Sequence, residues 1–294
     1  TYVAAAARVA SLPLADGRFL LAYGPGAKGG LTLVLADRTG DVIAIRPYDV
    51  MGASEQQSEP ALFLGPDGAA RIVWTSSRGD GNGRDIRLAR IDVTGDQIGP
   101  YGVPEFVNVA MAQDQHAPAV WYENGDGMVA FVTDLVKREV RVRRLDATGL
   151  PTGAEVVVAT PAVAIDRLAL VGAGDKRFLA WEEGSAIAGL VVNDDGTEAK
   201  MWKAEASTKY SHPNLVSDNG MTSLIVLLQS GLAIRIAQAS VKANGLIGPF
   251  KIFSDALLSN AAPTAFSSNP FHLWFGYVDE VPTTPALRLG LASP

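Results

Sequence analysis

The sequence predicts an all-β fold, a six-bladed β-propeller made of four-stranded antiparallel blades, and three observations lead to it. A polar turn ending in glycine recurs five times, with 47 to 55 residues between successive glycines. About twenty residues before each turn lies an apolar strand that usually carries an aromatic residue. Helical periodicity is almost absent. A period near 50 residues matches one propeller blade with its loops.

The turns and strands can be placed on the sequence one by one. The turn glycines are Gly40, Gly95, Gly149, Gly196 and Gly245. The six apolar strands are Phe19–Tyr23, Arg71–Trp74, Met128–Phe131, Phe178–Trp181, Leu224–Leu228 and Leu273–Tyr277. Tight turns with Gly, Asp or Asn precede these strands, because such residues accept the positive φ angles of short hairpins. The aromatic residues in the strands are expected to pack between neighbouring blades.

One repeat shows the expected blade in full. Strands are expected at Pro60–Leu64, Ala70–Thr75 and Asp85–Ile91, with an outer strand near Gln97–Val103. The period then divides the chain into one propeller domain, 1–294, with approximate repeats 7–58, 59–115, 116–164, 165–211, 212–261 and 262–294 plus 1–6. A many-stranded β-sandwich is the alternative, but a sandwich has no reason to keep a 50-residue period.

The sixth repeat is expected to lack its outer strand. The next turn would fall at residue 294, so the sixth blade is expected to be incomplete or closed by a short strand from residues 1–6. An unpaired edge strand is a template for strand addition, which predicts a protein partner or larger assembly at the edge between blades six and one.

The repeat resembles that of TolB-like proteins and of large secreted bacterial propellers. The residues that carry the resemblance are Pro60–Gly68 followed by Ile72–Gly81, and His116–Trp121 followed by Asp126–Phe131. Only the second repeat is a close match. The resemblance implies six blades, an envelope or extracellular setting, and binding rather than catalysis. The expected location is extracellular, periplasmic or on a virion surface. It transfers no catalytic residue to this chain.

Composition excludes several classes of partner and cofactor. The formal charge is −6, from 31 acidic and 25 basic residues, so neither nucleic acid nor an anionic membrane surface is an expected partner. No apolar run approaches the roughly 20 residues of a membrane-spanning helix, and membrane insertion is not expected. The chain has no cysteine and three histidines without metal-binding spacing. We therefore expect no cofactor.

Two groups of residues are candidates for binding. Polar residues lie just before the expected inner strands, where the loops of a propeller meet at the mouth of its channel: Glu59, His116, Asp166, Arg167 and His212. A second group belongs to a glycine-rich loop and forms an expected loop surface: Arg78, Asp80, Asn82 and Asp85. This loop has alternating oxygen ligands but fails the EF-hand pattern, with Arg84 and Ile91 at ligand positions, so no metal site is expected.

Two functions follow from these observations. The first is a non-enzymatic binding or assembly module of a bacterial envelope, a secreted complex or a virus particle, with no catalytic residue. A glycan ligand is possible on this view, but loop aromatics do not recur in equivalent positions. The alternative is a hydrolase, possibly glycan-directed, that acts at the channel mouth with Glu59, His116, Asp166 and His212.

Overall fold

The architecture is all-β, in a computed structural model of the chain. The structure describes residues 8–24, 30–48, 56–77, 83–109, 114–134, 137–197, 200–204, 209–218, 220–230, 233–252, 264–269, 272–281 and 284–292. The chain divides into two compact units, Thr1–Thr160 and Pro161–Pro294. We describe each unit by itself.

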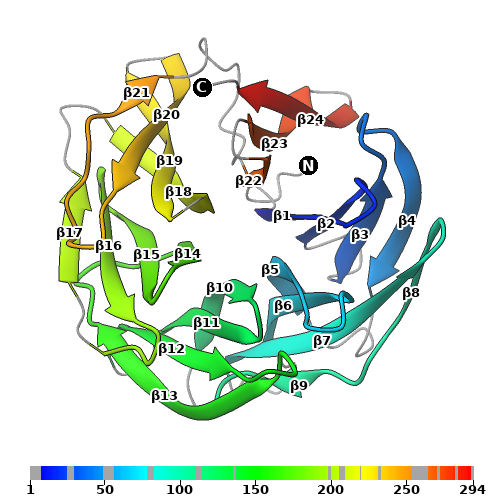
Figure 1. Ribbon diagram of the computed structural model, residues 1–294, viewed down its shortest axis with the longest axis horizontal. Coiled ribbons are helices and arrows are strands. Elements are labelled where there is room, and N and C mark those ends of the chain that lie inside the picture. The colour runs from blue at the N-terminus through cyan, green and yellow to red at the C-terminus, as the bar shows by residue number, and fades with distance from the viewer. Residues whose placement is uncertain are drawn as a thin grey trace. The chain divides into compact units, whose positions relative to one another are not determined.

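The first unit contains three antiparallel blades (Figure 1). Blade 1 consists of β1 (Arg8–Pro13), β2 (Phe19–Gly24), β3 (Leu31–Ala36) and β4 (Val42–Tyr48). Blade 2 consists of β5 (Gln56–Leu64), β6 (Ala70–Ser77), β7 (Arg84–Thr94) and β8 (Gln97–Tyr101), and the short β9 (Glu105–Phe106) also pairs with β7. Blade 3 consists of β10 (Gln115–Glu123), β11 (Asp126–Thr133), β12 (Glu139–Leu145) and β13 (Pro151–Ala159). The first strands are neighbours, because β5 contacts both β1 and β10.

The second unit contains two blades and a three-stranded sheet. Blade 4 consists of β14 (Leu168–Ala173), β15 (Lys176–Glu183), β16 (Ala186–Asn193) and β17 (Lys200–Ala204). Blade 5 consists of β18 (Lys209–Asp218), β19 (Met221–Ser230), β20 (Ala233–Val241) and β21 (Lys251–Ile252). The last sheet consists of β22 (Thr264–Asn269), β23 (His272–Val281) and β24 (Thr284–Ala292). Here β18 contacts both β14 and β22, so the first strands are again neighbours.

The four-stranded antiparallel blade is confirmed, but the number of blades is corrected. Five sheets have the full set of strands, and the last sheet pairs only three among the described residues. Six blades, the sixth incomplete or closed by a short N-terminal strand, were expected because the repeat was counted from its turns and second strands, which the last sheet also contains. Residues 1–6, the expected closing strand, lie outside the described residues. A partner at this edge stays a prediction.

The recurring glycine turns have a common hydrogen-bond pattern. In the turn between β12 and β13, the Gly149 N–H donates to the Asp146 carbonyl at 2.8 Å, and the Asp146 N–H donates to the Leu150 carbonyl at 2.8 Å. Gly149 has φ 76°, a left-handed conformation that glycine adopts without strain. The same two bonds close the turns at Gly40, Gly196 and Gly245. The turn at Gly95 differs, because β7 and β8 pair up to Thr94 and Gln97.

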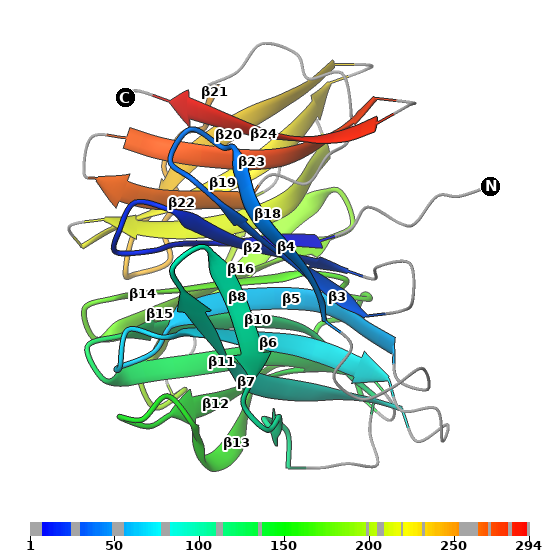
Figure 2. The same ribbon diagram turned by 90° about the vertical axis from the view of Figure 1, so that its right-hand side faces the viewer.

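Aromatic side chains between neighbouring sheets form much of the core. Trp74, Phe131 and Trp181 are fully buried, as the strand pattern predicts, whereas Tyr23 is half-buried. Trp74 belongs to a cluster between blades 1 and 2, where its ring meets Tyr48 edge-on at 5.6 Å. Figure 2 shows these strands from the side, each blade following the next along the unit. Burial of large aromatic rings from both sides stabilises the stacking of the blades.

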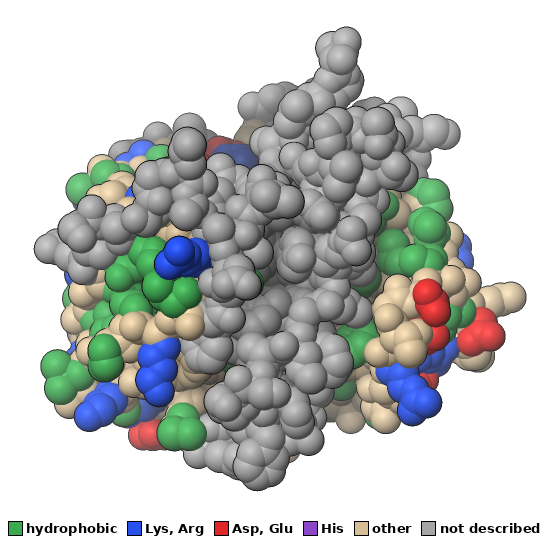
Figure 3. All heavy atoms as spheres, turned by 90° about the horizontal axis from the view of Figure 1, so that it is seen from above, with side chains coloured by type: hydrophobic (Ala, Val, Ile, Leu, Met, Phe, Trp, Pro, Cys, Tyr) green, Lys and Arg blue, Asp and Glu red, His purple; other side chains and the backbone are tan. Residues whose placement is uncertain are grey.

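The described surface mixes charged, polar and apolar side chains. In the view of Figure 3, basic side chains occur singly or in small groups between hydrophobic and neutral ones. Exposed apolar side chains include Met201, Met221 and Leu246. The described residues contain no helix long and apolar enough to cross a membrane.

Candidate active site

Three first strands contain the same irregularity, a bulge at a residue that precedes proline. Glu59, Ala117 and His212 have φ angles of 54°, 55° and 54°, and each is followed by a proline. The pairing register shifts at these points, in β5, β10 and β18. A positive φ is unfavourable for non-glycine residues and costs about 1 to 3 kcal/mol. The bulge also removes the local N–H group from the strand ladder, so that group needs another acceptor.

Carboxylates from the preceding blade accept two of these N–H groups. The Ala117 N–H donates to Glu59 Oε2 at 2.7 Å, and the His212 N–H donates to Glu182 Oε1 at 2.7 Å. Glu59 Oε2 also accepts a hydrogen bond from the Thr75 hydroxyl at 2.6 Å. Each carboxylate therefore joins two neighbouring blades of one unit at the start of a first strand.

A second carboxylate lies at the same end of blade 3. Asp134 follows β11, and its Oδ2 atom lies 3.1 Å from His116 Nε2. Its Oδ1 atom accepts a hydrogen bond from Arg138 Nε at 2.9 Å. The His116 side chain is 5% exposed and that of Asp134 is 24% exposed. The imidazole is thus buried, while the carboxylate that it contacts is partly exposed.

A third carboxylate, Asp114, is paired with Arg84. Arg84 Nε and one terminal nitrogen donate to the two Asp114 oxygens at 2.8 and 2.7 Å, and the Arg84 backbone N–H donates to Oδ1 at 3.0 Å. The side-chain hydrogen bond from Arg84 lowers the pKa of Asp114, and this outweighs the effect of desolvation. The pKa of Arg84 is raised, first by the hydrogen bond to Asp114 and in smaller part by the charges of Glu59 and Asp134.

These side chains form one group, which we call the blade 2–3 cluster. It contains three carboxylates and three basic side chains: Glu59, Asp114, Asp134, Arg84, His116 and Arg138. The pairing of β10 with β11 explains how Asp114 and Asp134 come together. Gln115 pairs with Thr133, and the Asp134 N–H donates to the Asp114 carbonyl at 3.0 Å. Among the described residues, no three acidic or histidine side chains are arranged to hold a metal ion.

The five candidate channel residues are divided between the two units. Glu59 and His116 lie in the blade 2–3 cluster, inside β5 and β10 rather than just before them. Asp166 is exposed and Arg167 half-buried in the segment before β14. His212 lies in β18, with its Nδ1 atom 3.9 Å from Glu182. The structure therefore brings Glu59 and His116 together, while Asp166, Arg167 and His212 belong to the second unit.

Of the four residues of the expected loop surface, the structure describes only Asp85, and it is buried rather than exposed. Asp85 is 3% exposed and lies in β7, where it accepts a hydrogen bond from the Asn108 side chain at 2.9 Å. The amide oxygen of Asn108 in turn accepts a hydrogen bond from the Ile86 N–H at 2.7 Å. Asp85 is buried because β9 and the following residues cover this end of β7. Arg78, Asp80 and Asn82 lie outside the described residues.

Sequence reasoning missed Arg84, Asp114 and Arg138 as members of the cluster. A signal for Asp114 existed, because it and Asp134 lie at similar distances from the β10–β11 turn and antiparallel pairing brings such residues together. No comparable signal marks Arg84, whose partner Asp114 is 30 residues away on another blade.

Comparison with known proteins supports the propeller fold. No protein-family model matches the sequence, and no curated protein matches it. Among solved structures, the chain is similar to an α-L-arabinanase from Penicillium chrysogenum complexed with arabinobiose, with 14% identity, a TM-score of 0.70, and coverage of 99% of this chain and 94% of that chain. A protein of unknown function from Dyadobacter fermentans gives 14% identity and a TM-score of 0.70 over 98% of this chain and 94% of its own. An endo-arabinase from Bacteroides thetaiotaomicron gives 11% identity and a TM-score of 0.54 over 97% and 93%.

These matches correct the functional interpretation of the repeat. Two of these three structures are an α-L-arabinanase and an endo-arabinase, not TolB-like propellers. The expectation of a non-enzymatic binding or assembly module is therefore wrong. It rested on the resemblance of one repeat, and the same four-stranded blade also builds hydrolases. At this level of identity the comparisons show the fold, and the chain is a β-propeller whose fold is shared by glycoside hydrolases.

Proposed function

We propose that this protein is a hydrolase that cleaves a glycosidic bond at the blade 2–3 cluster. One observation carries the proposal: two carboxylates, one from blade 2 and one from blade 3, contact two consecutive residues of β10. Asp134 contacts the His116 side chain, and Glu59 accepts the Ala117 N–H. Glycoside hydrolysis needs two carboxyl groups, one that protonates the leaving oxygen and one that acts as base or nucleophile.

The surroundings of the carboxylates suggest their roles. Asp134 Oδ1 accepts a hydrogen bond from Arg138 Nε at 2.9 Å, and a carboxylate held in this way by a guanidinium suits the base or nucleophile. Glu59 is then the second carboxyl group that the reaction needs. Asp114 is bound on both oxygens by Arg84, and the lowered pKa makes it a poor proton donor. His116 acts as a positioning residue, because its buried ring contacts Asp134 Oδ2.

The similar structures suggest which substrates to test. They include an α-L-arabinanase, an α-L-arabinofuranosidase and an exo-β-1,3-galactanase solved with β-1,3-galactotriose. We therefore propose arabinose- or galactose-containing glycans as the substrate class. Asp166 and His212 lie in the second unit and have no role in this proposal.

Substitution of the two carboxylates tests the proposal. Sugar release from linear arabinan and β-1,3-galactotriose should fall by roughly 100-fold or more in Glu59→Gln and in Asp134→Asn, the loss typical of a missing acid or base. Glutamine keeps an acceptor for the Ala117 N–H, so the bulge should be retained.

The matched control for this experiment is Asp175→Asn, since that carboxylate is 83% exposed and lies in the second unit. Its activity should equal that of the unmodified protein. Undiminished activity in both Glu59→Gln and Asp134→Asn, or no cleavage of any glycosidic bond by the unmodified protein, would contradict the proposal.

A further inference from the structure

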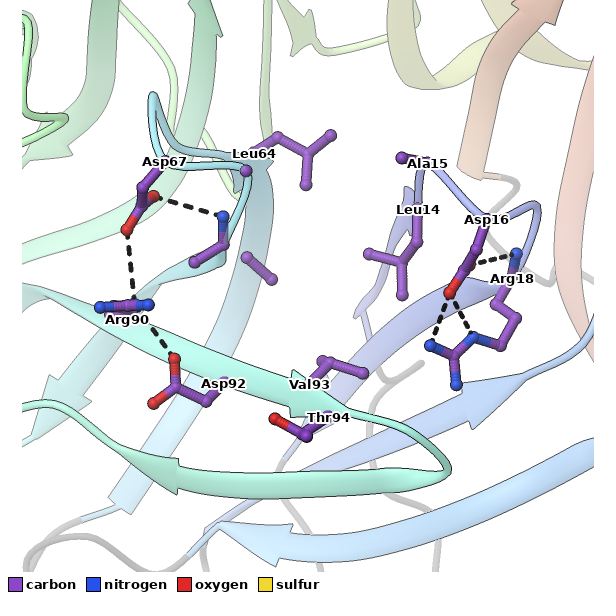
Figure 4. Close-up of a pocket in the computed structure, with 13 residues that line it drawn as sticks. Leu14, Ala15, Asp16, Arg18, Leu64, Asp67, Arg90, Asp92, Val93 and Thr94 are labelled. Carbon is purple, nitrogen blue, oxygen red and sulfur yellow. Dashed lines mark hydrogen bonds and ion pairs between the residues drawn. The ribbon is translucent and has the colours of Figure 1, made fainter.

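A pocket of about 430 Å³ lies between blades 1 and 2, at the end of β5 opposite Glu59. The β1–β2 turn, the β5–β6 turn and the end of β7 form its lining (Figure 4). Glu59 and Leu64 are five residues apart in β5, about 16 Å along an extended strand, so the pocket is separate from the blade 2–3 cluster. Its volume lies within the usual range of small-molecule sites.

The centre of the pocket is apolar and its two walls are charged. Figure 4 shows the side chains of Leu14 and Leu64 in the space between the walls, with Val93 below them. On one wall Arg18 Nε donates to Asp16 Oδ2 at 2.8 Å. On the other wall Arg90 Nε lies 3.1 Å from Asp92 Oδ1 and 3.5 Å from Asp67 Oδ2.

The second wall retains unused hydrogen-bonding capacity. The closest contacts of the Arg90 side chain with Asp92 and Asp67 are made through Nε, and its two terminal nitrogens donate no hydrogen bond in the part of the chain that the structure describes. Asp92 Oδ2 likewise accepts no hydrogen bond among the described residues. About half of each side chain is exposed and both residues line the pocket, so donors and an acceptor are open to solvent at this wall.

These features select the class of ligand. Each wall combines both signs of charge at contact distance, so the pocket gives little net attraction to a simple anion or cation. A neutral ligand whose hydroxyl groups both donate and accept hydrogen bonds fits such walls, and its C–H face fits the leucine and valine side chains. A peptide strand fits less well, because the turns bond their own backbone, as in Gly17 N–H to Leu14 O at 3.0 Å and Gly68 N–H to Gly65 O at 3.0 Å.

We infer that the pocket between blades 1 and 2 is a carbohydrate-binding site, distinct from the proposed catalytic cluster. Leu14, Leu64 and Val93 receive the apolar face of a sugar ring, and Arg90 with Asp92 bonds its hydroxyl groups. The inference concerns binding alone and does not require that the protein hydrolyse the bound saccharide.

A cavity-filling variant tests the inference. Ala15 is exposed and lines the pocket, so Ala15→Phe should fill it without removing a hydrogen bond. Calorimetric titration with arabinotriose and with β-1,3-galactotriose should show a binding site in the full chain whose affinity falls at least tenfold in Ala15→Phe. Arg90→Leu should give a similar loss, which keeps the test decisive if the first variant is poorly folded.

Ala147→Phe is the matched control, because Ala147 is exposed in the β12–β13 turn and does not line the pocket. This variant should bind as the unmodified protein does. Unchanged affinity in both Ala15→Phe and Arg90→Leu, or no binding of either saccharide, would overturn the inference. Titrations in a Glu59→Gln background separate the two sites, since a defect in hydrolysis there leaves the pocket and its affinity intact.

Discussion

Asp114 shows how a single charged residue can make stability depend on pH. Its pKa in the folded protein is lowered by the hydrogen bond from Arg84, below the value of about 3.9 expected in the unfolded chain. The unfolded state therefore binds a proton more readily. The resulting stabilisation is fully present above the unfolded pKa and is lost as the pH falls through the folded pKa.

Substitution of Asp114 by asparagine should remove this contribution. The pair is partly exposed, so we expect a loss of about 1 kcal/mol in the free energy of unfolding at pH 7. The difference between the two proteins should shrink as the pH falls from the unfolded pKa of about 3.9 through the lower pKa of Asp114 in the folded protein. Urea unfolding followed at pH 7, 5 and 3 measures it. A difference in the free energy of unfolding that stays constant across this range would contradict the role of the carboxylate charge. The control variant Asp175→Asn should unfold like the unmodified protein at every pH.

At the scale of single residues, sequence reasoning singled out two of the six residues of the blade 2–3 cluster as candidates for the channel mouth. Glu59 and His116 could be found because a polar residue before a proline-led strand is visible in the sequence. The positive φ of Glu59 could not be found, since residues before proline usually adopt extended conformations. The place of Arg84 in the cluster could not be predicted from the sequence either, because its contact with Asp114 depends on the packing of blade 2 against blade 3.

At the scale of strands, Gly189 shows a contact that packing imposes on the sequence. It lies in β16, opposite Ala180 on one side and Trp202 on the other. A Cβ atom at this position would lie 2.1 Å from Trp202 Cζ2 and 2.2 Å from the Leu179 carbonyl oxygen. The indole of Trp202 therefore occupies the space that any other residue at position 189 would need.

Gly189→Ala should destabilise the protein by about 2 to 3 kcal/mol, the upper part of the range for overpacked sites. The clash involves a backbone oxygen, which cannot rotate away as a side chain can. Gly102→Ala is the matched control, because its added Cβ would come no closer than 3.7 Å to a neighbouring atom. The midpoint of urea unfolding measures both variants. Equal midpoints for Gly189→Ala and Gly102→Ala would contradict this prediction, because they would show that β16 can shift to accommodate the added methyl group without a loss of stability.

The charge of the whole molecule predicts what it does not bind. With a formal charge of −6, the chain has no net attraction to the phosphate backbone. We expect no retardation of a 30-base-pair DNA duplex at about 0.15 M salt, where surface charges act over about 8 Å. Gel mobility shift measures it, with a basic DNA-binding protein as positive control. A shift that disappears at higher salt would reveal a cationic surface and contradict this prediction.

The sequence alone determined the all-β fold, the four-stranded blade and the glycine turns, because these depend on local pairing and on φ angles that few residues accept. Tertiary structure alone decided how many blades are complete, which carboxylates meet at β10, and where a pocket lies. Those features depend on contacts between residues on different blades, such as Ala117 with Glu59, 58 positions apart. A local pattern does not encode such pairs, because blade packing brings them together only after each sheet has formed.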